Sequence, residues 1–262
     1  MCLDTLTFGW VIAMKHLLVA SLACFSCLAA SAAPMTLNGT VRDFNADGVN
    51  FEAINYTAGS GWVDSTLVGA SPTLTAAGAA NIDDTAGSAG AFSNWYTNAA
   101  NSKAHSITLT EISPGIYDYT NNSFFPINGD LLGNEGRSQN YHFTYAVSSS
   151  FGYKPGTGQS FTFTGDDDVW VYFDKQLGID IGGVHSGQTQ TVLLDTVMGA
   201  KPMGNYSFDF FFAERHTTES NLRIETSLVF MDPPSSVPEP GSLALIGMSL
   251  FGLAAVRRRK GA

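Results

Sequence analysis

The 262-residue chain is poor in cysteine and in basic residues. Its three cysteines, Cys2, Cys24 and Cys27, all precede residue 30, so the rest of the chain can form no disulfide bond, thiolate metal site or cysteine nucleophile. Residues 33–230 hold only 8 Lys and Arg against 20 Asp and Glu. Because a protein that binds nucleic acid needs a basic face for phosphate, this balance excludes DNA and RNA as partners.

Amphipathic stretches of helical length and internal repeats are also missing between the two ends of the chain. Apolar and polar residues alternate over residues 141–147 and 222–230, and residues 169–173 and 206–213 are runs of β-branched or aromatic residues. The Ala-, Gly-, Ser- and Thr-rich residues 69–91 are expected to form a long surface loop with one short helix. The pattern predicts an all-β domain, an antiparallel β-sandwich of two sheets with long loops.

The N-terminus has the order of a secretory signal peptide. Lys15 and His16 precede an apolar run, which ends in small residues that include Ala30 and Ala32. We therefore expect export through the Sec machinery and cleavage of residues 1–32. The first 13 residues carry no positive charge, which favours translation from Met14.

The C-terminus carries a second targeting pattern. A linker over residues 231–240 ends in Pro238-Glu239-Pro240, and the uncharged residues 241–256 are followed by Arg257-Arg258-Arg259-Lys260. Sixteen helical residues span roughly 24 Å, slightly less than a hydrocarbon core of about 30 Å. The four cations would hold that end in the cytoplasm. The segment 241–262 is therefore predicted to contain a hydrophobic helix followed by the Arg cluster, and a plain membrane anchor is one interpretation.

This order of Pro-Glu-Pro, apolar helix and Arg cluster resembles the PEP-CTERM sorting signal of Gram-negative bacteria that make exopolysaccharide. The resemblance implies recognition by an exosortase and cleavage near Pro238–Pro240. The inner membrane would hold the chain only transiently. Delivery to the cell surface or extracellular matrix would follow.

The region between the two signals resembles fibro-slime domains, relatives of PA14, over nearly all of residues 37–230. The resemblance is carried, in order, by Val41–Phe44, Asn122–Pro126, Phe161–Tyr172, Asp180–His185, Phe210–Thr218 and Arg223–Leu228. It implies a secreted adhesive or matrix β-domain over residues 33–230. Among PA14 relatives, carbohydrate is the usual ligand class.

Three adjacent aspartates, Asp166, Asp167 and Asp168, are the main candidate site. Neighbouring carboxylates repel one another, so such a cluster is stable mainly when water solvates it or a hard cation neutralises it. Both alternatives stay open. The PA14 resemblance implies a Ca²⁺ ion on Asp166 and Asp167, because Asp174 opens the next turn. Asp168 stands where many PA14 domains have Gly.

Weaker patterns indicate four candidate ligand-binding residues and one candidate calcium loop. Asp168, His185, Arg215 and His216 lie in the matched blocks and are candidate ligand-binding residues, although each His can equally serve a turn. Two His without a third ligand make a poor zinc site. The segment 43–48 begins like a calcium loop, but Ile54 occupies the position of the bidentate acid, which favours a structural turn.

The aromatic residues Trp62, Trp95, Trp170 and Tyr172 could stack on sugar rings. However, Trp170 and Tyr172 stand inside an expected strand, which favours the core. No Gly-x-Ser-x-Gly elbow, His-Glu-x-x-His helix or phosphate-binding Gly loop is present. Paired carboxylates would allow glycoside hydrolysis, but we expect no enzyme.

The sequence therefore predicts an exported protein of the cell surface or matrix that binds an extracellular glycan or exopolysaccharide with the help of Ca²⁺. A purely structural matrix protein is the alternative.

Overall fold

The computed structural model describes residues 33–52 and 58–231. Strands make up 45% and helices 6% of the structure, which confirms the all-β prediction. In chain order the elements are β1 (Met35–Asp43), α1 (Ala76–Ala79), the 3₁₀-helix η1 (Phe92–Asn94), β2 (Ser102–Ser113), β3 (Ile116–Asn121), β4 (Phe143–Tyr153), β5 (Ser160–Asp166), β6 (Asp168–Phe173), β7 (Gln176–Ile181), β8 (Gln188–Leu193), α2 (Leu194–Met198), β9 (Gly204–Glu214), β10 (Asn221–Thr226) and β11 (Phe230–Met231).

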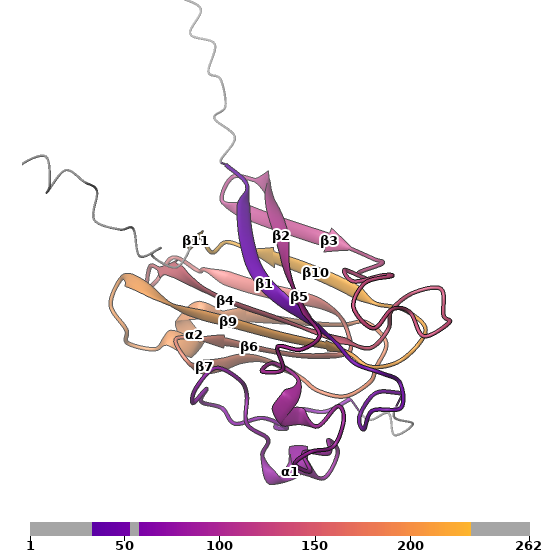
Figure 1. Cartoon of the computed structure of the whole chain (residues 1–262). Coiled ribbons are helices and arrows are strands. Elements are labelled where there is room, and N and C mark those ends of the chain that lie inside the picture. The colour runs from indigo at the N-terminus through magenta and orange to yellow at the C-terminus, as the bar shows by residue number, and fades with distance from the viewer. Residues whose placement is uncertain (1–32, 53–57, 232–262) are drawn as a thin grey trace, which may run out of the picture. The chain divides into compact units, whose positions relative to one another are not determined.

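The strands form two antiparallel layers that share β2 (Figure 1). One layer has the order β7-β6-β9-β4-β1-β2, and the other continues from β2 through β3, β10 and β5 to β8. Residues 102–109 of β2 pair with β1, whereas residues 110–113 pair with β3. The predicted antiparallel sandwich is therefore a single sheet that folds over at β2.

Aromatic side chains fill the space between the two layers. The Phe161 ring on β5 lies 5.6 Å from the ring of Phe173 and 5.5 Å from that of Phe208, both on the opposite layer. Burying each such side chain contributes about 1.5–3 kcal/mol. This core, which includes the alternating apolar residues of β4 and β10, fixes the distance between the layers.

A second apolar cluster covers the outer face of β6 and β9. The chain between β1 and β2 packs Phe92 and Trp95 against Trp170, with ring centroids 5.7 and 6.5 Å away. This segment contains the predicted short helix, α1, but residues such as Ile82 are buried in the cluster. The expectation of a surface loop over residues 69–91 is thus corrected in part, because β6 is apolar on both faces and its outer face needs a cover.

The β6–β7 hairpin turns at Asp174 and Lys175, whose φ angles of 48° and 66° give two left-handed residues in a row. Asp174 therefore opens the turn as predicted. None of the described helices has the length and apolar character needed to span a bilayer. The predicted signal peptide with Ala30 and Ala32, and the sorting segment after Met231, lie outside the described residues.

Candidate functional site

The three adjacent aspartates lie where the chain crosses from one layer of the sandwich to the other. β5 ends at Asp166 and β6 begins at Asp168, and the Asp166–Asp167 peptide bond is cis. Their exposed fractions are 4%, 3% and 0%. The interpretation as an acidic turn in water is therefore wrong, because buried carboxylates need partners from the protein or from a ligand.

Asp168 is neutralised by a buried ion pair with Arg215. The guanidinium Nε donates to Asp168 Oδ2 at 2.6 Å and Nη2 donates to Oδ1 at 3.2 Å. The guanidinium also lies 5.4 Å from the ring centre of Trp95. Neither residue lines the pocket described below, so the expectation that Asp168 and Arg215 contact a ligand is corrected: they fix the backbone beneath the site.

Asp166 and Asp167 are held by backbone N–H groups of two different loops. Asp167 accepts from the N–H of His185 at 3.0 Å and from the N–H of Arg215 at 3.1 Å. Asp166 accepts from the backbone and side-chain nitrogens of Asn221 at 2.5 and 3.0 Å. Burial, followed by the charge of Asp168, raises the pKa of Asp167 to about 7. Burial also raises the pKa of Asp166.

Glu214, the last residue of β9, adds a third carboxyl group that sequence reasoning missed. Its side chain is 1% exposed, and Oε2 has no hydrogen-bond partner among the described residues. Burial and the charges of Asp167 and Asp166 raise its pKa well above the ordinary value. The sequence held one signal for it, because Glu214 directly follows the apolar residues 210–213 at the end of β9.

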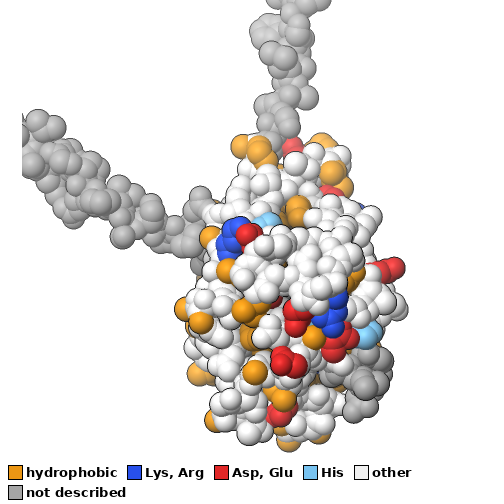
Figure 2. Space-filling view, turned by 45° about the vertical axis from the view of Figure 1, so that its right-hand side comes forward, with side chains coloured by type: hydrophobic (Ala, Val, Ile, Leu, Met, Phe, Trp, Pro, Cys, Tyr) orange, Lys and Arg blue, Asp and Glu red, His pale blue; other side chains and the backbone are white. Residues whose placement is uncertain are grey.

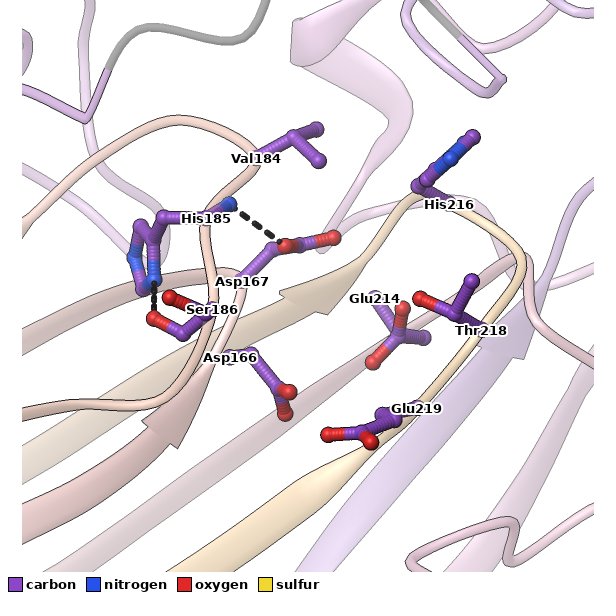
Figure 3. A pocket seen from close by; sticks show the side chains of 9 residues that line it. All are labelled: Asp166, Asp167, Val184, His185, Ser186, Glu214, His216, Thr218 and Glu219. Atoms are coloured by element: carbon purple, nitrogen blue, oxygen red, sulfur yellow. Dashed lines mark hydrogen bonds between the residues drawn. The ribbon is translucent and has the colours of Figure 1, made fainter.

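These carboxyl groups line an open hollow of about 440 Å³ at one end of the sandwich. Asp166 and Asp167 on one side face Glu214 and Glu219 on the other (Figure 3). The remaining lining residues are Val184, His185, Ser186, His216 and Thr218. Such a volume lies within the range of about 300–1,000 Å³ that is typical of small-molecule sites.

The two candidate histidines have different places at the pocket. The backbone of His185 holds Asp167, its Nδ1 lies 2.9 Å from the Ser186 carbonyl oxygen, and its buried Nε2 has no partner among the described residues. His216 lies at the rim, where its Nδ1 is 2.9 Å from Glu52 Oε2. Both therefore line the pocket, and their role in ligand binding stays a prediction.

A charged cluster lies behind the rim and ties three loops together. His142, whose side chain is 1% exposed, has Nε2 3.0 Å from Glu52 Oε1 and Nδ1 2.8 Å from Glu135 Oε2. Arg137 lies 3.6 Å from Glu52 and 3.4 Å from Glu135. Figure 2 shows carboxylates gathered beside basic side chains on a surface that is otherwise largely uncharged. Through Glu52, this cluster positions the His216 loop.

The donor set suits a hard cation only with help from other oxygens. Among the described residues, no three His, Cys, Asp or Glu side chains are grouped so as to hold a metal ion by themselves. The side chain of Glu214 nevertheless lies opposite Asp166 and Asp167 (Figure 3), and its buried Oε2 has no hydrogen-bond partner among the described residues. Ca²⁺ takes six to eight oxygens and accepts backbone carbonyls and water. The residues present thus fit Ca²⁺ as part of a mixed ligand set.

Two other sequence patterns serve the structure. Asp43 is 2% exposed and accepts hydrogen bonds from Asn140 Nδ2 and from the Leu132 N–H, at 2.9 and 2.8 Å. The segment 43–48 is therefore a structural turn, as predicted.

The four aromatic residues considered for sugar stacking are at most 6% exposed and belong to the second apolar cluster: Trp62, Trp95, Trp170 and Tyr172.

Comparison with known proteins confirms the C-terminal motif. Residues 236–260 match the PEP-CTERM protein-sorting motif, which contains Pro238-Glu239-Pro240 and Arg257-Arg258-Arg259. The motif marks an exported protein that is sorted by an exosortase.

The central region has relatives in Dictyostelium discoideum. The chain is 40% identical to protein psiQ over 160 residues, which cover 54% of this chain and 16% of psiQ. It is 50% identical to protein psiC over 123 residues, which cover 44% of this chain and 23% of psiC. The chain thus spans about a sixth to a quarter of the length of these relatives. These fibro-slime-like homologues confirm the resemblance stated above.

Similar solved structures include two PA14 domains. The PA14 domain of the MpAFP antifreeze protein has a TM-score of 0.34 and 9% identity, and the match covers 79% of this chain and 88% of that domain. The PA14 sugar-binding domain of an RTX adhesin has a TM-score of 0.30 and 14% identity, covering 47% of this chain and 75% of that domain.

Proposed function

We propose that this chain is an exported surface or matrix protein whose β-domain binds carbohydrate, with Ca²⁺ held at Asp166 and Asp167. The observation that carries the proposal is the buried carboxyl group of Glu214, which lies across the hollow from these two aspartates and whose Oε2 has no hydrogen-bond partner among the described residues. An unsatisfied buried carboxylate costs free energy, so its retention at a pocket points to a ligand. The PEP-CTERM motif supports the place of action outside the cytoplasm.

The residues that would hold the ion are Asp166 and Asp167, which Glu214 faces across the pocket, and backbone carbonyl groups and water would complete the ligand set. When bound, Ca²⁺ would neutralise charge in the pocket and offer open coordination positions to sugar hydroxyl groups. Burial raises the pKa of Asp167 to about 7 and raises the pKa of Glu214 well above its ordinary value, so both carboxyl groups resist ionisation in the pocket. A cation would favour the ionised form of both groups.

The surrounding residues keep these oxygens in place. The Asp168–Arg215 pair, with Gly183 donating its N–H to Asp168 Oδ1 at 2.6 Å, ties the β5–β6 junction to both loops of the pocket. Asn221 fixes Asp166 from the start of β10. Because these oxygens are already held in place by the protein, binding the ion would cost less entropy.

Carbohydrate is the ligand class that the PA14 resemblance implies and that the pocket chemistry supports. The hydroxyls of Ser186 and Thr218 line the hollow together with carboxylates, and both residues are exposed. Such groups exchange hydrogen bonds with sugar hydroxyls. An exopolysaccharide is the expected partner of an exosortase-sorted protein. A structural matrix protein without a ligand is the alternative.

A glycan array separates these alternatives. The purified protein should bind a subset of glycans in millimolar Ca²⁺ and lose them in EDTA. Asp166→Asn with Asp167→Asn should abolish the signal, whereas Asp47→Asn with Asp64→Asn, which removes two exposed carboxylates elsewhere, should preserve it. Binding to no glycan would favour the structural alternative, and release of shortened sugars would indicate an enzyme instead.

A further inference from the structure

The acidic pocket contains more carboxyl groups than one divalent cation can neutralise. Four carboxyl groups line it, and none of its lining residues is Lys or Arg: the acids are Asp166, Asp167, Glu214 and Glu219. If a Ca²⁺ ion neutralises two of them, two remain. Because the hollow is partly enclosed by protein, such charges are screened less than on an open surface.

The nearest guanidinium groups cannot supply the missing positive charge. Arg215 is bound to both oxygens of Asp168, and its Nη1 donates to the Asn50 carbonyl oxygen at 3.3 Å. Arg137 lies between Glu52 and Glu135. Both cations are therefore used by carboxylates that lie outside the pocket.

Two of the four carboxyl groups are available to a ligand. Glu214 is buried and its Oε2 has no partner among the described residues. Glu219 is exposed at the mouth of the pocket and forms no ion pair with the residues that the structure describes. Its one side-chain contact is a long hydrogen bond of 3.4 Å from Asn221 Nδ2. The buried Glu214 favours a cation inside the pocket. The exposed Glu219 can contact a ligand at the entrance.

We propose that this pocket selects glycans that carry a free amino group, such as 2-amino-2-deoxyhexose units, and discriminates against uronates. The inference rests on the proposed carbohydrate-binding function and names its sugar class. Glu219 pairs with the ammonium group at the mouth, while sugar hydroxyls reach the interior. A uronate carboxylate in the same place meets the carboxylate of Glu219, a like-charge contact that opposes binding.

The hydrogen-bonding groups of the rim agree with this choice. Thr218 and Ser186 can donate to or accept from neutral hydroxyls. The hollow of about 440 Å³ is of the size that suits a small polar ligand. Neutral sugars can therefore bind in the pocket, and an ammonium group on the sugar raises the affinity through Glu219.

Isothermal titration with three matched oligosaccharides tests the inference. Oligomers of glucosamine, of N-acetylglucosamine and of galacturonate are titrated into the purified protein in millimolar Ca²⁺ at mildly acidic pH, where the amines are protonated. The glucosamine oligomer should bind about fivefold more tightly than its N-acetylated counterpart, the ratio expected for one exposed ion pair. The galacturonate oligomer should bind most weakly.

Glu219→Gln should bring the affinities of the amino and N-acetyl oligomers together, and Asp64→Asn should leave their ratio unchanged. Added salt should reduce the wild-type ratio. If the uronate or the N-acetyl oligomer binds as tightly as the amine, or if Glu219→Gln leaves the ratio intact, the amino-sugar inference is overturned and the proposed function stands. Absence of binding to every oligosaccharide, in the presence of a Ca²⁺-induced rise in Tm, overturns both the sugar class and carbohydrate binding.

Discussion

At the scale of single residues, His142 connects the pocket rim to the rest of the protein. Both ring nitrogens lie within 3.0 Å of carboxylate oxygens, one from Glu52 and one from Glu135. Glu52 also reaches His216, so one carboxylate orders the loop that forms the pocket mouth.

Replacing Glu52 with Gln should destabilise the fold by about 1–3 kcal/mol at neutral pH. Burial alone would raise the pKa of Glu52, but the hydrogen bond and charge of His142 and the charge of His216 together lower it. A lowered pKa gives stability that is present above the unfolded-state pKa and is lost as pH falls through the folded-state pKa. Urea unfolding of both proteins at neutral and at acidic pH measures the difference.

The destabilisation by Glu52→Gln should thus shrink in acid. Glu225→Gln, on the sheet face beside Arg223, is the matched control and should show a smaller effect. A difference between wild type and Glu52→Gln that stays constant down to about pH 3, below the ordinary Glu pKa, would argue against the ionic role of Glu52.

Glu214→Gln should stabilise the metal-free protein at neutral pH. A carboxyl whose folded-state pKa is raised contributes stability below its unfolded-state pKa and loses it as pH rises. For Glu214 this loss begins as pH rises above the ordinary Glu pKa of about 4.3. In EDTA at neutral pH, the variant should therefore melt above wild type, and its response to Ca²⁺ should be smaller. A variant that melts at or below wild type and keeps the full Ca²⁺ response would contradict the assigned role.

The sequence predicted part of this site and missed the rest for a physical reason. Asp166 to Asp168 are adjacent in the chain, so their mutual repulsion is visible without a structure. Glu214 comes to them only because β9 pairs with β6, and Asp168 is opposite Ala213 in that pairing. Glu52 and His142 are brought together over 90 residues. Sequence patterns within one segment cannot predict contacts between segments that are far apart in the chain.

At the scale of secondary-structure elements, β5 and β10 set the register that places Asp166 beside Asn221. Gly165 lies one residue before Asp166, where an added Cβ would come within 2.2 Å of the Asn221 carbonyl oxygen. Only glycine allows this close approach of backbones. The register of this strand pair therefore depends on a single residue next to the site.

Gly165→Ala should destabilise the protein by about 1–3 kcal/mol and weaken its response to Ca²⁺. The clash is with backbone, which must shift and move Asn221 away from Asp166. Gly187→Ala is the matched control, because nothing lies within 4 Å of a Cβ there. Differential scanning calorimetry with and without Ca²⁺ gives both quantities. Equal behaviour of the two variants would show that the register tolerates the change.

The strands were predicted best where apolar and polar residues alternate strictly. Leu222, Ile224 and Thr226 on β10 are buried as the period of two requires. The predicted run to residue 230 is interrupted after Thr226, where the Ser227 N–H donates to the Ser160 carbonyl oxygen at 3.1 Å. The segment between β1 and β2 lacks periodicity. Its packing depends on isolated aromatic residues, so its covering role could not be predicted.

At the scale of the whole molecule, export and sorting predict the form of the mature protein. The signal peptide pattern ends at Ala32, and the PEP-CTERM motif covers residues 236–260. Intact mass spectrometry of protein recovered from its native host should show a start near Ala33 and loss of the segment after Pro240. A recovered form that still carries Arg257–Lys260 would refute the predicted processing.

The central claim is that Asp166 and Asp167 hold a Ca²⁺ ion in the folded protein, and thermal unfolding tests it most directly. At a hundredfold excess over the dissociation constant, an ion that binds only the folded state stabilises it by about 2.7 kcal/mol. For a domain of this size, each kcal/mol raises Tm by about 2–4 °C.

The purified protein is therefore unfolded in EDTA and then in millimolar Ca²⁺, with equal Mg²⁺ as a comparison. Wild type and the control Asp47→Asn with Asp64→Asn should gain several degrees in Ca²⁺ and less in Mg²⁺. Asp166→Asn with Asp167→Asn, shown to be folded by circular dichroism, should gain nothing. Superimposable wild-type melting curves in EDTA and in Ca²⁺ would contradict the account.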